Sequence, residues 1–161
     1  MKLRAGIAGL GRWGRVLVDS IHERSEIVAV VAGCTGRKEK AAPYCVDKGI
    51  DLRDTFADLL KDEKLDAVII ATPHAQHADQ IIAAANAGKH VFVEKPFTMT
   101  KESAERAKNA CATAGVVCAL GHNRRFLPSM QGLRNLIHGG EIGHPVHVEA
   151  NISTPGRDYS A

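Results

Sequence analysis

Short apolar runs alternate along the chain with segments whose apolar residues recur at helical spacing. Five runs predict strands buried on both faces, as in a parallel sheet: 3–8, 27–32, 65–71, 90–93 and 116–120. The intervening segments predict helices: 12–23, 38–48, 54–60, 75–87 and 100–114. This repeated unit predicts an α/β fold, a doubly wound parallel sheet with helices on both faces.

Residues that favour or oppose helix ends refine these boundaries. Asp54 and Thr100 are suited to cap the helices that they begin, and Gly88 and Gly115 are suited to end two others. Pro43 has no amide hydrogen, so we expect it to disturb the helix around it or to mark a late start.

The pattern changes after Gly121, which predicts a first domain at 1–121 and a second segment at 122–161. A helix is expected at 128–137, and an alternating, half-exposed strand at 146–153. We interpret 122–161 as the crossover helix and first strand of a truncated α/β domain. Since one strand is not stable alone, we expect an exposed apolar patch and association, including a homo-oligomer.

Composition narrows the class of protein. The 161 residues are 45% hydrophobic and 4% aromatic, enough for one domain with an aliphatic core. The net charge of +3 is spread along the chain, which argues against nucleic-acid binding. No apolar run is long enough for a membrane span, and the N-terminus has the pattern of a strand, so we expect a cytoplasmic protein. The spacing of cysteines and histidines predicts reduced thiols and no metal site.

A glycine-rich turn lies between the first predicted strand and helix. Gly9, Gly11 and Gly14 fit the G-x-G-x-x-G pattern, which in this context predicts a Rossmann domain that binds a dinucleotide. We expect Gly9 to permit the turn, Gly11 to let the backbone approach a pyrophosphate, and Gly14 to let helix and strand pack closely. Arg12 and Trp13 are candidates for contacts with the phosphates or the nicotinamide.

The end of the second strand bears on the choice of cofactor. An acidic residue that binds the ribose of NAD is usual there, but the segment 32–38 (AGCTGRK) contains none. Thr35 is able to hydrogen-bond a 2′-phosphate, and Arg37 or Lys38 to pair with it. We therefore favour NADP(H) over NAD(H), while Glu39 keeps NAD(H) possible.

Two later strands end in polar residues at the edge where ligands bind. Thr72 and Pro73 follow one strand, and His77 lies either against the cofactor or simply in the first helical turn. Glu94 and Lys95 follow the next strand. Lys95 is our candidate catalytic residue, an electrostatic stabiliser or proton donor in hydride transfer, with Glu94 orienting it.

Four segments together resemble the Gfo/Idh/MocA family, the glucose–fructose oxidoreductase and inositol dehydrogenase group: 6–11 (GIAGLG), 71–73 (Ala-Thr-Pro), 93–97 (VEKPF) and 121–126 (GHNRRF). The resemblance implies NAD(P) and a sugar or cyclitol substrate. Lys95 matches the family's Glu-Lys-Pro lysine. Asn123 and Arg124 match the segment that passes beside the cofactor into the second domain. The family's catalytic Asp and His residues of that domain have no counterpart here.

Two functions stay open from the sequence. The first is an NAD(P)-dependent oxidoreductase, or its cofactor-binding half, that transfers hydride to or from a sugar- or cyclitol-like alcohol or ketone. The alternative is a non-catalytic dinucleotide-binding module. A methyltransferase with a similar glycine turn is a weaker idea, because the Glu-Lys-Pro stretch and the crossover segment argue against it.

Overall fold

The structure is a computed structural model that describes residues 2–22 and 24–151. A first compact unit ends at His122 and a second begins at Asn123. In the first unit the strands are β1 Leu3–Ala8, β2 Val28–Cys34, β3 Asp51–Arg53, β4 Ala67–Ile70, β5 His90–Val93 and β6 Cys118–Leu120. Its helices are α1 Arg12–Ile21, α2 Lys38–Asp47, α3 Phe56–Leu60, the 3-10 turn η1 His74–Gln76, α4 His77–Asn86 and α5 Lys101–Ala114.

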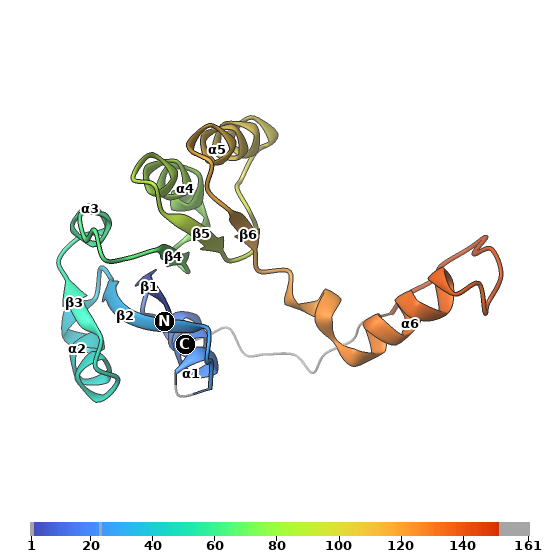
Figure 1. Ribbon diagram of the computed structural model, residues 1–161, viewed down its shortest axis with the longest axis horizontal. Helices are drawn as coiled ribbons and strands as arrows, with labels where there is room; N and C mark the ends of the chain where they lie inside the picture. The colour runs from blue at the N-terminus through green and yellow to red at the C-terminus, as the bar shows by residue number, and fades with distance from the viewer. Residues whose placement is uncertain (1, 23, 152–161) are drawn as a thin grey trace. The chain divides into compact units, whose positions relative to one another are not determined.

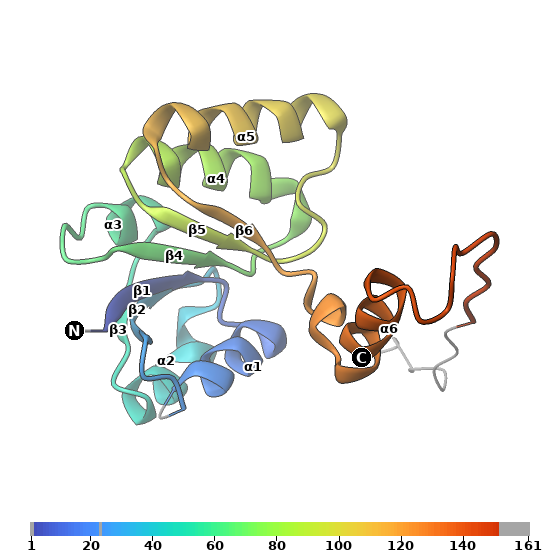
Figure 2. The ribbon, with the colours of Figure 1, turned by 45° about the vertical axis from the view of Figure 1, so that its right-hand side comes forward.

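The six strands pair in parallel in the order β3-β2-β1-β4-β5-β6. Helices α1 and α2 cover one face, and α3, α4 and α5 cover the other (Figures 1 and 2). The predicted doubly wound α/β sheet is confirmed. The strand order reverses between β1 and β4, and in such sheets ligands bind at the carboxyl edge beside this switch point.

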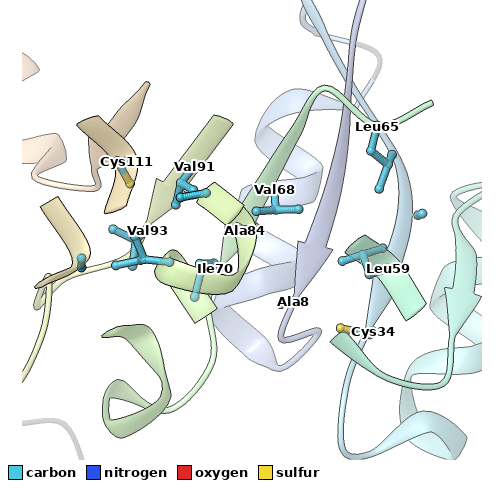
Figure 3. Packing of buried hydrophobic residues seen from close by; sticks show 14 residues of the cluster. Ala8, Cys34, Leu59, Leu65, Val68, Ile70, Ala84, Val91, Val93 and Cys111 are labelled. Atoms are coloured by element: carbon cyan, nitrogen blue, oxygen red, sulfur yellow. The ribbon is translucent and has the colours of Figure 1, made fainter. Parts of the chain in front are cut away.

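Each sheet face has its own core of small aliphatic residues. On the side of α3, α4 and α5, Leu59, Ile81 and Ala107 pack against Val68 and Ile70 (Figure 3 shows the cluster's strand residues). The other core fills the space beneath α1 and α2 and contains Ile7, Leu10, Val18, Val30 and Cys45. Burial on both faces explains why these strands are continuous apolar runs.

Several helix ends follow the expected chemistry. The hydroxyl of Thr100 accepts a hydrogen bond from the Ser103 amide at 3.2 Å, and Gly115 ends α5 in the left-handed region with φ 67°. Pro43 lies inside α2 without interrupting it, so the expected disturbance is absent and the helix forgoes one backbone hydrogen bond. Glu23, the expected end of the first helix, lies outside the described residues.

The structure corrects two expected helix boundaries and adds one strand. Thr55, not Asp54, caps α3, because the Thr55 hydroxyl accepts a hydrogen bond from the Asp58 amide at 3.0 Å. The segment 75–87 is divided into η1 and α4. Strand β3 was not predicted, because three residues with charged ends carry no apolar run.

The second unit contains the 3-10 turn η2 Asn123–Phe126 and helix α6 Pro128–His138. The helix matches the predicted one, and Pro128 stands in its first turn. The strand expected at 146–153 is wrong for residues 146–151, which form no strand, and residues 152 and 153 lie outside the described ranges. A strand needs a hydrogen-bonded neighbour, and the described part of this unit offers none.

Candidate functional site

The turn between β1 and α1 packs closely against neighbouring backbone at two of its glycines, whereas space is free beside the third. Gly9 has φ 97°, and a Cβ atom there would overlap the carbonyl oxygen of Ala71. A Cβ atom on Gly14 would overlap the carbonyl oxygen of Gly9. No described atom beyond its chain neighbours lies within 4 Å of the Cβ position of Gly11. The backbone at Gly11 is therefore accessible to a bulky ligand such as a pyrophosphate.

The start of α1 presents unpaired backbone amides. Gly11 occupies the N-cap position, no side chain caps the helix, and its first turn contains no acidic residue. Arg12 and Trp13 are exposed beside it, Trp13 by 41%. Free amides and the positive end of the helix dipole favour an anion at this end.

A cleft of about 500 Å³ opens at the carboxyl edge of the sheet. It brings together the glycine turn and the segments after β2, β3 and β4, and its lining includes the carboxylate of Asp54. Of the predicted residues it is lined by Gly9, Gly11, Thr35, Arg37, Thr72 and Pro73. Two glutamines that the sequence reasoning missed also line it, Gln76 from η1 and Gln80 from α4. These two are polar helix residues that belong to no recognisable motif, so nothing in the sequence indicated that they line a cleft.

A second cavity of about 500 Å³, here called the cationic pocket, shares Gly11, Thr35 and Arg37 with the cleft. Its charged lining consists of four cations, Arg12, Arg15, Arg37 and Lys40, and contains no carboxylate. Among the described residues, no carboxylate forms an ion pair with any of these four. An uncompensated cluster of this kind attracts an anion.

Arg15 and Lys40 were not predicted as site residues. The Arg15 guanidinium donates to the carbonyls of Leu10 at 3.3 Å and Lys40 at 2.6 Å, and lies 4.9 Å from the centre of the Tyr44 ring. The spacing of the basic residues could have indicated them: Arg12 and Arg15 are three residues apart on α1, and Lys40 lies three residues after Arg37, the N-cap of α2.

Lys38 faces another cavity. Its ammonium pairs with Asp54, and both line a space of about 930 Å³ along β3 and α3, here called the mixed-charge cavity. Cys34 remains at the cleft, where burial raises the pKa of its thiol to about 11. This thiol is uncharged near neutral pH and adds no negative charge beside the cationic pocket.

The loop after β5 contains the candidate catalytic residue. Lys95 is exposed, and its backbone amide donates to Glu94 Oε2 at 3.2 Å. Glu94 is buried, so its carboxylate orients the Lys95 backbone, and no contact of Glu94 with the Lys95 ammonium is present. The Lys95–Pro96 peptide is cis. Neither Glu94 nor Lys95 lines the cleft or the cationic pocket.

His77 is fully buried and links two loops. Its Nδ1 lies 2.8 Å from the Pro96 carbonyl oxygen, and its Nε2 lies 3.1 Å from that of Thr72. Asn123 and Arg124, the remaining predicted cofactor contacts, are exposed in η2 of the second unit.

Comparison with known proteins identifies the relatives of this chain. The model of the family described as "Oxidoreductase family, NAD-binding Rossmann fold", Gfo/Idh/MocA, matches residues 3–122. The scyllo-inositol 2-dehydrogenase (NAD(+)) of Bacillus subtilis is 38% identical over 154 residues, which are 92% of this chain and 44% of the relative. The 1,5-anhydro-D-fructose reductase of Ensifer adhaerens is 34% identical over 145 residues, 85% of this chain and 44% of the relative.

A solved structure gives the same picture. Scyllo-inositol dehydrogenase from Lactobacillus casei, with bound NAD(H) and scyllo-inositol, superposes with a TM-score of 0.81 at 31% identity. The match covers 89% of this chain and 43% of that protein. The chain thus spans less than half the length of these relatives. Within the described ranges, every helix is too short or too polar to cross a lipid bilayer.

Proposed function

This chain belongs to the Gfo/Idh/MocA family of oxidoreductases, and from this premise we propose that it is the NADP(H)-binding part of a dehydrogenase. The substrate that we propose is an alcohol or ketone of the sugar or cyclitol class, in keeping with the names of its relatives. The preference for NADP(H) departs from the NAD(+) in the name of the Bacillus subtilis relative.

The cationic pocket carries the proposal. It adjoins the cleft at Thr35 and Arg37, directly after β2, where a bound adenosine ribose presents its 2′ position in this fold. A 2′-phosphate there would find the Thr35 hydroxyl and the cations of the pocket. Arg37 is exposed, and no carboxylate within residues 2–22 and 24–151 forms an ion pair with it, so its guanidinium is free to turn toward the phosphate.

The rest of the site fits a dinucleotide. The open backbone at Gly11 and the uncapped amides of α1 suit a pyrophosphate, and Thr72 and Pro73 also line the cleft. When bound, the nicotinamide supplies the hydride donor or acceptor. The chain's part is to hold the dinucleotide at the carboxyl edge and to carry Lys95 on the loop after β5.

We assign Lys95 the catalytic role. An exposed ammonium on this loop is able to stabilise negative charge on a substrate oxygen or to donate a proton to it. Glu94 fixes the backbone from which this side chain extends. Asn123 and Arg124 are proposed as further cofactor contacts from the second unit.

The four cysteines are free thiols in the structure, and thiols of this kind persist in a reducing compartment such as the cytoplasm. We propose that compartment for the protein.

Titration of the chain with NADPH and with NADH, followed by nicotinamide fluorescence, tests the proposal. We expect NADPH to bind about tenfold more tightly than NADH. A charge-assisted hydrogen bond to the 2′-phosphate contributes about 1.5 kcal/mol, which corresponds to roughly this factor. Tighter NADH binding would overturn the cofactor preference and leave the family unchanged. Binding of neither would contradict the proposal that this chain holds the dinucleotide.

A further inference from the structure

His77 carries two polar atoms into a fully buried position, and both face backbone carbonyls from different loops. The Pro96 oxygen, 2.8 Å from Nδ1, belongs to the loop after β5. The Thr72 oxygen, 3.1 Å from Nε2, belongs to the loop after β4. These loops are separated in sequence by α4 and β5, so one imidazole spans two neighbouring segments of the carboxyl edge.

The chemistry of the ring makes these contacts directional. A carbonyl oxygen only accepts hydrogen bonds, so each bond requires a hydrogen on the ring nitrogen that faces it. A neutral imidazole donates to one of the two carbonyls, and a ring with hydrogen on both nitrogens donates to both. An aliphatic side chain of similar volume would leave both carbonyls without this partner.

The two linked residues belong to different parts of the site. Thr72 lines the cleft, and its hydroxyl donates to Gln80 Oε1 at 2.5 Å. Pro96 follows Lys95 directly. We infer that His77 is a positioning residue that ties the Thr72 wall of the dinucleotide cleft to the loop of Lys95. This inference rests on the proposed function for its link to the cofactor, whereas the tie between the loops is independent of it.

Two amides report on the two loops without any ligand. The Lys95 amide donates to Glu94 Oε2, and the Gln76 amide donates to the Pro73 carbonyl at 2.9 Å. Hydrogen exchange of these amides, measured by NMR in the free chain, follows each loop separately. In His77→Ala we expect both amides to exchange roughly fivefold faster relative to the core, because the imidazole no longer lies between the Thr72 and Pro96 carbonyls.

Two further variants each retain a hydrogen-bond donor near one of the two ring nitrogens of His77. His77→Asn keeps a donor near the Nδ1 position, so we expect it to protect Lys95 and to release Gln76. His77→Gln keeps a donor near the Nε2 position, so we expect the reverse pattern. This exchange of patterns is not expected from a side chain that only fills space, and the test stands even if His77→Ala does not fold.

The matched control is His90→Ala. His90 lies at the amino end of β5, where its Nδ1 accepts the Val117 amide at 3.0 Å, so this variant also loses a backbone hydrogen bond. It should lower thermal stability without faster exchange at Lys95 or Gln76. Indistinguishable patterns for the Asn and Gln variants, or the same loop exchange in His90→Ala, would overturn the inference.

Nucleotide titration then tests the link to the cofactor. We expect His77→Ala to bind NADPH roughly fivefold more weakly than the wild type, and His90→Ala to bind it unchanged. Equal affinities for the two variants would overturn the link. If the wild-type chain binds no dinucleotide, the proposed function fails, while the exchange patterns still decide whether His77 ties the loops.

Discussion

The mixed-charge cavity along β3 is nearly twice as large as the cationic pocket beside α1, about 930 Å³ against about 500 Å³. Its charges are largely compensated, since Lys38 pairs with Asp54, Arg53 with Asp51 and Asp62, and Lys61 with Asp58.

The cationic pocket, by contrast, has four cations and no carboxylate in its lining. Exposed ion pairs contribute little to stability and neutralise each other, whereas a cluster of unpaired cations beside free helix amides favours the binding of an anion. The comparison indicates that compensation of charge, rather than volume, distinguishes the proposed ligand site from a solvated surface.

Reversal of one charge in each cavity gives the largest expected effect. We expect Arg37→Glu to weaken NADPH binding about 100-fold, because it removes a charge-assisted hydrogen bond and repels the phosphate. NADH binding should change far less. Lys61→Glu makes the same change in the mixed-charge cavity and should leave both affinities as they are. Equal losses for the two variants in a fluorescence titration would break the comparison.

The glycine turn separates stability from binding. Gly11→Ala should weaken NADPH and NADH alike by about tenfold, since its methyl group enters the space proposed for the pyrophosphate. Its melting temperature should stay unchanged. Gly9→Ala, at φ 97°, should instead lose about 2 kcal/mol of unfolding free energy. Calorimetric melting and titration of both variants measure these effects, and a stability loss in Gly11→Ala would contradict the open turn.

Salt offers a smaller effect that needs no substitution. Raising ionic strength from about 0.01 M to 0.15 M shortens the screening length from about 30 Å to 8 Å. The advantage of NADPH over NADH should therefore shrink severalfold, because the extra phosphate meets exposed cations. A ratio of the two dissociation constants that is independent of salt would speak against ionic recognition.

The smallest effect concerns the compensated cavity. The hydrogen bond from Lys61, with one from Thr55, lowers the pKa of Asp58 from its ordinary 3.8. A carboxyl whose pKa is lower in the folded state contributes stability above about pH 4, and this contribution is lost as pH falls through the folded value. Asp58→Asn should slightly flatten the acid side of the stability profile and leave NADPH affinity unchanged. An NMR titration of Asp58 that gives an ordinary pKa would contradict this.

Periodicity and glycine spacing were enough to predict five of the six strands, their parallel direction and the glycine turn, because buried parallel strands and tight turns restrict residue type locally. Contacts between residues far apart in the sequence could not be predicted in this way. The pairing of Lys38 with Asp54 spans 16 residues, and both side chains line the mixed-charge cavity. Arg15 enters that pocket through contacts with Leu10 and Lys40.

His77 shows the same limit. From the sequence, a cofactor contact and a polar residue in the first helical turn were equally good interpretations of His77. Only the fold brings the Thr72 and Pro96 carbonyls to its two ring nitrogens. The alternating pattern at 146–151 predicted a strand that does not form. A strand depends on a hydrogen-bonded neighbour, and the pattern itself does not contain one.

Calorimetric titration with 2′,5′-ADP and with 5′-AMP tests the central claim most directly. These ligands differ only by the 2′-phosphate and need neither the nicotinamide nor the second unit. The cationic pocket predicts that 2′,5′-ADP binds the wild-type chain about tenfold more tightly, and that Arg37→Glu reverses this preference. Equal affinities in the wild type, or tighter binding of 5′-AMP, would contradict the assignment of the unpaired cations to a 2′-phosphate.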